Sequence, residues 1–254
     1  MIGVLSAPLE AHEFWLDPTR YMVDPGAPLI ANIRNGENFK GRALPYLEVD
    51  IARFDLIIGD VSMPVEGRLG DIPALEQPAR EDGLVVIVHQ TTPSLLTYRG
   101  WEKFQKFADH KDFPGLRERH DARGLPVDKF KESYTRYAKA LVGVGGSAGQ
   151  DRETGMETEF VAIDNPYLGT PETLRFRLLY QQAPRVDAQV EVFDRAPDGT
   201  VSIHLYRTND AGEVEIPVIS GHNYLLDSVV LREMPDGSDA VWETLWAAMT
   251  FAVP

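Results

Sequence analysis

Short apolar runs separated by turn-forming residues fill the first third of the chain. Three of these runs, at residues 29–33, 49–58 and 84–88, are rich in β-branched and aliphatic side chains. Turns that contain Gly or Pro lie between them. The pattern predicts a β-sandwich or barrel in the N-terminal half.

The spacing of large side chains changes between residues 101 and 142. Trp101, Phe104 and Phe107 recur at intervals of three, which is typical of one face of a helix. A second series continues at helical spacing: Phe130, Tyr134, Tyr137 and Leu141. We therefore expect two or three helices within 101–142.

A glycine-rich stretch at 143–155 separates this region from a second set of strands. Its composition predicts a flexible connection. Beyond it, the turn Pro197-Asp198-Gly199 lies between two alternating runs, which is a strong hairpin signal. In the second run, we expect Val201, Ile203 and Leu205 to point to the core and His204 to lie on the outer face.

These segments predict a mostly β protein of two β-sandwich domains, immunoglobulin-like in strand number, with a helical insertion between them. We expect the N-terminal β-sandwich at 12–145, with its helical segment at 101–142. The C-terminal sandwich is expected at 156–254, and residues 1–11 are interpreted as the remnant of a signal peptide.

Composition narrows the range of partners. The formal net charge of −14 predicts repulsion of nucleic acid and of anionic lipid headgroups, and it concentrates cations near the surface. No run approaches the roughly 20 apolar residues of a spanning helix, so no membrane insertion is expected. Since the chain has no cysteine, imidazole, carboxylate, amine or backbone oxygen would have to hold any metal.

The first residues carry the main candidate for chemistry. The apolar start ends in Leu9-Glu10-Ala11, which is similar to the end of a secretory signal, and cleavage after Ala11 would predict export to the periplasm. The mature chain would then begin at His12, whose α-amine and imidazole together can chelate a transition metal ion. A surface histidine at a frayed terminus is the alternative interpretation. Glu13 follows directly as a further candidate ligand.

Two other histidines are candidate metal ligands. His110 and His120 end two short helical segments joined by a bend at 112–114, which could bring them together. Structural hydrogen bonding is the alternative role for both. No phosphate-binding loop, nucleophile elbow or zinc-protease helix is present, so catalytic residues are not assigned.

Several motifs in one order resemble an uncharacterised bacterial envelope family that is often labelled the periplasmic component of cobalt or nickel uptake. They are residues 11–16 (AHEFWL), 139–144 (KALVGV), 165–167 (NPY), 178–181 (LLYQ) and 242–251 (WETLWAAMTF). The resemblance implies export with cleavage before the histidine, an N-terminal β-sandwich and a transthyretin-like C-terminal β-sandwich at 156–254. It carries a metal role to His12 only. Many members have a histidine in the penultimate strand, where this sequence has Ser228-Val-Val-Leu-Arg232.

Three functions remain open at this point. The first is a periplasmic binder of nickel, cobalt or copper, associated with an inner-membrane transporter or an outer-membrane receptor. The second is a metal-free interaction module that binds a receptor, transporter or polysaccharide. The third is a copper-dependent oxidase, which would need an open coordination position. The sequence favours the metal binder and predicts that the protein is not an enzyme.

Overall fold

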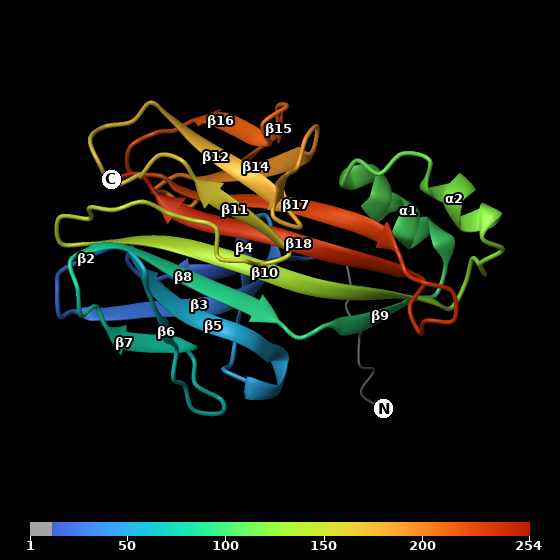
Figure 1. Cartoon of the computed structure of the whole chain (residues 1–254), viewed down its shortest axis with the longest axis horizontal. Helices are drawn as coiled ribbons and strands as arrows, with labels where there is room; N and C mark the ends of the chain where they lie inside the picture. The colour runs from blue at the N-terminus through green and yellow to red at the C-terminus, as the bar shows by residue number, and fades with distance from the viewer. Residues whose placement is uncertain (1–11) are drawn as a thin grey trace.

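The computed structural model describes residues 12–254, and its fold is mostly β, as predicted. The strands form three sheets, with two smaller sheets on opposite faces of a larger one (Figure 1). We call these the N-terminal, central and C-terminal sheets. The two hydrophobic cores lie on either side of the central sheet, so both halves of the chain share it.

The N-terminal sheet has the order β1-β3-β4, with β7 also paired to β3. Its strands are β1 (Glu13–Pro18), β3 (Pro28–Glu37), β4 (Lys40–Leu44) and β7 (Leu75–Pro78). The C-terminal sheet has the order β11-β12-β13, with β16 paired to β12. Its strands are β11 (Thr158–Ala162), β12 (Thr173–Tyr180), β13 (Ala183–Pro184) and β16 (Glu213–Pro217).

The central sheet combines strands from both halves in the order β15-β14-β17-β18-β10-β8-β5-β6, and β2 and β9 also pair with β10. The first-half strands are β2 (Met22–Val23), β5 (Ile51–Ile58), β6 (Val61–Pro64), β8 (Gly83–Thr91), β9 (Ser94–Tyr98) and β10 (Phe130–Val144). The second-half strands are β14 (Gln189–Arg195), β15 (Val201–Arg207), β17 (Asn223–Glu233) and β18 (Trp242–Ala252). A 3-10 turn, Glu48–Asp50, precedes β5.

The two halves join through β10 and β18, which run parallel from the pair Glu132–Trp242 to the pair Ala140–Thr250. Because β18 also pairs with β17 along its whole length, the sheet continues without a break from one half into the other. The placement of a domain boundary between 145 and 156 stays a prediction.

Two helices cover one end of the central sheet, at the far right of Figure 1. They are α1 (Trp101–His110) and α2 (Leu116–Ala122), and with β9 we call them the helical cap. Phe104 and Ala108 of α1 are fully buried in an aromatic cluster that includes Trp242 and Trp246 of β18. Helix was therefore predicted correctly for this part of the 101–142 segment.

The remainder of the predicted helical segment is wrong, because residues 130–144 form the strand β10. The strand is covered on both faces over most of its length, so apolar side chains occupy consecutive positions and no alternation is visible. The helical spacing of its aromatic residues is coincidental. Pairing with β8 and β9 on one side and β18 on the other supplies its backbone hydrogen bonds.

The connection at 143–155, predicted to be flexible, is anchored to the protein. The Leu84 amide donates to the Ala148 carbonyl at 2.7 Å. Lys139, which is fully buried in β10, donates to Asp151 at 2.9 Å, and the Ala162 amide donates to the same carboxylate at 2.8 Å. The glycines of this connection therefore indicate tight turns rather than flexibility.

The predicted hairpin is present, since β14 and β15 pair antiparallel. The prediction that Ile203 and Leu205 point to the core is wrong: they are 45% and 62% exposed. β15 is an edge strand of the central sheet, and of its three predicted core residues only Val201 packs, partly buried, against a core cluster. His204 is exposed, as predicted.

Candidate functional site

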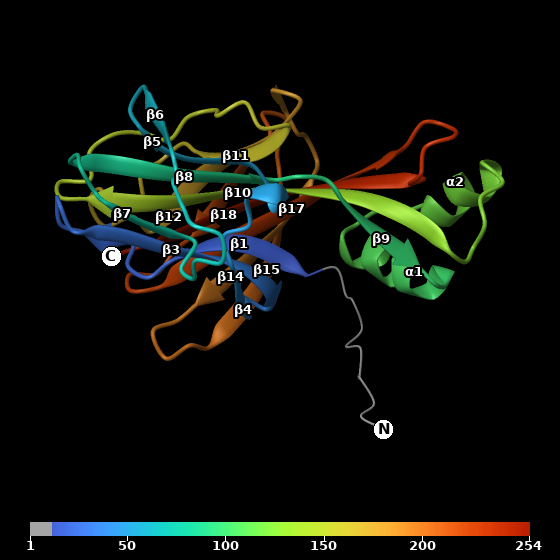
Figure 2. The same cartoon turned by 90° about the horizontal axis from the view of Figure 1, so that it is seen from below.

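A groove of about 1060 Å³ opens beside the central sheet, with β10 and β18 forming part of its lining. β1, β3 and β4 of the N-terminal sheet line one side and β9 of the helical cap lines another. Figure 2 shows the start of β1 directed toward the end of the molecule that carries the helices. The volume is of the size that binds small molecules in proteins.

Polar groups without partners lie in the lining of the groove. Arg136 of β10 is only 7% exposed, and its guanidinium stacks 4.0 Å from the centre of the Trp246 ring. His89 of β8 is 2% exposed and packs against the rings of Phe14 and Phe54. Within residues 12–254, neither His89 ring nitrogen has a hydrogen-bond partner. Burial lowers the pKa of His89 to about 3, so its ring is neutral at physiological pH.

A buried ionic cluster lies where the helical cap meets strands β14 and β17 of the central sheet. Lys111, which follows α1, donates to Glu191 at 2.7 Å and to Asp227 at 2.9 Å. Burial lowers the pKa of Lys111, but the charges of Asp227 and Glu191 outweigh burial and the net shift is upward. His110 lies 3.0 Å from Glu191, and that hydrogen bond raises the pKa of His110.

Glu13 faces this ionic cluster. Burial raises the pKa of Glu13 to about 7, and the negative charge of Asp227 adds to the effect. Consecutive side chains of a strand point to opposite faces. Accordingly, His12 and Phe14 line the groove, whereas Glu13 does not. Of the four predicted ligands, Glu13 and His110 therefore lie near the same ionic cluster. Lys111 occupies the centre of that cluster.

His12 lies at the groove, beside Glu37 of β3. Its Nδ1 is shielded from solvent and 3.0 Å from Glu37 Oε1, but the contact does not meet hydrogen-bond geometry. An imidazole nitrogen and a carboxylate oxygen therefore lie next to each other at the start of the described chain.

His120 is separate from these residues. It is fully buried in α2, where its Nε2 lies 2.9 Å from the Pro126 carbonyl oxygen and its Nδ1 accepts a hydrogen bond from Trp242 Nε1 at 3.0 Å. These two bonds fix one neutral tautomer, since Nε2 must carry the proton. Both nitrogens are engaged, so in this arrangement His120 holds the helical cap against β18.

Across residues 12–254, no three His, Asp or Glu side chains are grouped so as to hold a metal ion. The predicted cleavage point after Ala11 lies outside the described residues, and so does the α-amine that cleavage would create. Metal binding at His12, Glu13, His110 and His120 stays a prediction.

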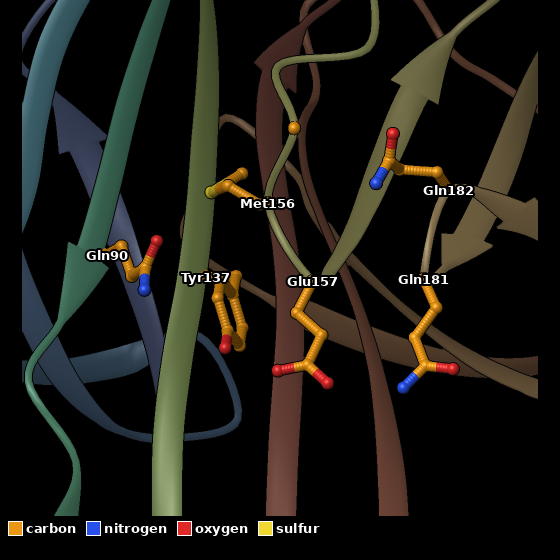
Figure 3. A pocket seen from close by; sticks show the side chains of 7 residues that line it. Gln90, Tyr137, Met156, Glu157, Gln181 and Gln182 are labelled. Carbon is orange, nitrogen blue, oxygen red and sulfur yellow. The ribbon is translucent and has the colours of Figure 1, made fainter.

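A second hollow of about 350 Å³ lies on the other side of the molecule, between β10 and the C-terminal sheet (Figure 3). Its lining is polar and includes Gln90, Tyr137, Glu157 and Gln181. The Glu157 carboxylate accepts a hydrogen bond from Arg232, which neutralises it. The larger groove, with its unpartnered buried groups, is the stronger candidate site.

Sequence reasoning missed Arg136, Lys111 and the burial of His89. Arg136 belongs to a segment interpreted as helix, where a charged residue is unremarkable on a solvent face. In a strand that is buried on both faces, the same arginine is a candidate functional residue, because buried charges are rare. Correct assignment of β10 as a strand would have singled it out.

The sheets and the groove define a mostly β protein with a ligand-sized groove at the junction of its N-terminal sheet, its central sheet and its helical cap. The chain belongs to the family described as Domain of unknown function (DUF4198), whose model matches residues 9–231. No curated protein matches the sequence. Within the described residues, no helix is long and apolar enough to cross a membrane.

Proposed function

We propose that this protein is exported to the periplasm and binds a divalent transition metal ion, nickel, cobalt or copper, at its processed N-terminus. The observation that carries the proposal is the 3.0 Å separation of His12 Nδ1 and Glu37 Oε1 outside hydrogen-bond geometry. Cleavage after Ala11 would add the α-amine of His12 as a third donor beside these two.

The separation suits two neighbouring ligands of one ion. Metal–nitrogen and metal–oxygen bonds are about 2.0–2.2 Å long, so two donors at a right angle lie about 3 Å apart. A tetrahedral angle would place them about 3.4 Å apart by the same bond lengths. Right-angle geometry is typical of tetragonal copper(II) and nickel(II).

The surrounding charge supports cation binding. The formal net charge of −14 attracts cations to the surface. Arg42 lines the same groove, and its positive charge opposes cation binding locally. Transfer of the ion to an inner-membrane transporter or an outer-membrane receptor is part of the proposal, since a periplasmic binder needs a partner to receive its metal.

The test is calorimetric titration of nickel, cobalt and copper into protein that begins at His12. We expect submicromolar binding, and a version with one extra N-terminal alanine should lose it because the chelating amine moves away from the imidazole. Glu37→Gln should weaken binding at least about tenfold, whereas Glu66→Gln, exposed and outside the groove lining, should not. Binding that is absent, or that survives the extra alanine, would overturn the proposal.

A metal-free interaction module is the second candidate. It is favoured by edge strand β15, which presents the exposed apolar side chains Ile203 and Leu205 beside an unpaired backbone edge. An envelope receptor, transporter or polysaccharide would be its partner. The same titration separates the two candidates, because only the first requires metal affinity that depends on the mature terminus.

A further inference from the structure

Arg136 is a buried cation without a counter-ion in the described chain. It is 7% exposed, and within residues 12–254 no carboxylate forms an ion pair with it. Its Nη1 is shielded from solvent and donates no hydrogen bond. A guanidinium stays charged at any physiological pH, so burial without a partner is costly.

Three carboxylates, Glu132, Asp227 and Glu13, are near enough for their charges to act on Arg136. Glu13 forms no ion pair with it within residues 12–254, although its Oε2 is buried without a hydrogen-bond partner there, and the other two are bound elsewhere. Glu132 accepts hydrogen bonds from Tyr98 at 2.8 Å and from Thr244. Asp227 is bound by Lys111 at 2.9 Å. The strand geometry therefore holds the acids away from the guanidinium, while the Trp246 ring supports its flat face at 4.0 Å. At least the Nη1 donor is therefore left without a partner in the described chain, at a residue that lines the groove.

The rest of the groove suits a small molecule with an apolar body. Phe14, Ile33, Leu44 and Leu96 supply apolar surface, and Thr91 and Ser94 supply hydroxyl groups. His89, whose two ring nitrogens also have no hydrogen-bond partner in the described chain, adds a neutral donor and acceptor. Ligand sites commonly combine such apolar walls with a few polar groups that fix orientation.

We propose that the groove binds a small organic monocarboxylate, with the carboxylate on the Arg136 guanidinium and the apolar body against Phe14, Ile33 and Leu96. Guanidinium and carboxylate match as a bidentate pair, which explains a buried arginine held flat on a tryptophan. A phosphate group carries more charge than one guanidinium neutralises, and the net charge of −14 repels it more strongly than it repels a monoanion. This inference does not rest on metal binding.

The test is calorimetric titration of 3-phenylpropionate into the full chain in the presence of EDTA, beside its neutral amide and inorganic phosphate. We expect the carboxylate to bind at least about tenfold more tightly than the amide, and phosphate not to compete, because a hydrogen bond to a charged group typically changes affinity by that factor or more. Equal affinity for acid and amide, or competition by phosphate, would overturn the proposal without any variant.

Variants locate the site. Arg136→Met should reduce 3-phenylpropionate affinity at least about tenfold and leave amide affinity unchanged, and Arg136→Lys should fall between, because lysine keeps the charge but lacks the fork. Arg80→Met removes the same charge at an exposed position outside the groove lining and should bind normally. Undiminished binding by Arg136→Met, or no binding of the carboxylate by the unaltered protein, would refute the assignment.

Discussion

The buried polar residues of this protein fall into two classes, those with unpartnered atoms and those whose hydrogen-bonding groups are engaged. Arg136 and His89 have unpartnered atoms in the lining of the groove, whereas Lys111 and His120 have their hydrogen-bonding groups engaged. Natural proteins keep few unsatisfied buried groups, and those that persist call for an explanation. A residue in the first class is thus a candidate for ligand contact, and one in the second class is a candidate for stability.

His89 should make the protein sensitive to acid. Its pKa is about 3 in the folded state against 6.5 for an unperturbed histidine, so the unfolded chain takes up a proton over this interval and the folded protein does not. The part of the free energy of unfolding that depends on neutral His89 should be fully present above pH 6.5 and should fall as the pH drops toward 3. His89→Phe should reduce that loss by about 4 kcal/mol, measured by urea unfolding from pH 7.5 to 3.5.

The control for this experiment is His204→Phe, which makes the same change on the exposed face of β15. Its pH dependence should match that of the unaltered protein. If His89→Phe and the unaltered protein lose stability in parallel on acidification, the ring is not kept neutral by burial.

Single elements owe their positions to contacts between distant parts of the chain. The segment at 145–157 has no regular structure, yet it is fixed because Lys139 of β10 reaches both Asp151 at 2.8 Å and Glu159 at 3.3 Å. All three side chains are almost completely excluded from solvent. Removing one partner of such a buried ion pair costs far more stability than replacing all of its members with apolar residues.

Lys139→Met should destabilise the protein by about 3–5 kcal/mol, because it leaves two carboxylates buried without a cation. Lys131→Met, which removes an exposed ion pair with Asp239, should cost less than about 1 kcal/mol. Urea unfolding measures both, and limited proteolysis should show faster cleavage at 145–157 in the first variant alone. Equal stabilities would mean that the buried pair does not anchor the segment.

Element type could be predicted where one face of a strand is exposed or a turn is distinctive. The β14–β15 hairpin was found from Pro197-Asp198-Gly199, and helix α1 of the cap from the spacing of Trp101, Phe104 and Phe107. β10 was not found, because burial on both faces removes the period of two on which strand assignment depends. The groove was missed with it, since Arg136 comes from that strand. His12 could be singled out from its position after Ala11 alone.

At the scale of the whole molecule, one sheet serves both halves of the chain. The N-terminal sheet packs on one face of the central sheet and the C-terminal sheet on the other, and β10 and β18 lie side by side at the middle. A hydrogen bond from Thr250 to the Leu16 carbonyl at 2.7 Å also ties the last strand to the first. Neither half can lose its structure without exposing the core of the other.

We therefore expect a single cooperative unfolding transition. Tryptophan fluorescence and far-ultraviolet circular dichroism should give the same urea midpoint, because tryptophans lie in β1, in the helical cap and in β18. A chain that ends at residue 241 should lack stable tertiary structure throughout. Two separate transitions, or a folded N-terminal half in the shortened chain, would show that the halves are independent.

The parallel pairing of β10 with β18 also sets the order in which the protein can fold during synthesis. The nascent chain completes β10 (Phe130–Val144) well before its partner strand β18 (Trp242–Ala252) is made. Until then one long edge of a hydrophobic strand stays unpaired, and such edges promote aggregation. The high contact order of this pairing predicts slow folding that is completed only after β18 has been made, and hence a dependence on chaperones that protect the exposed edge until then.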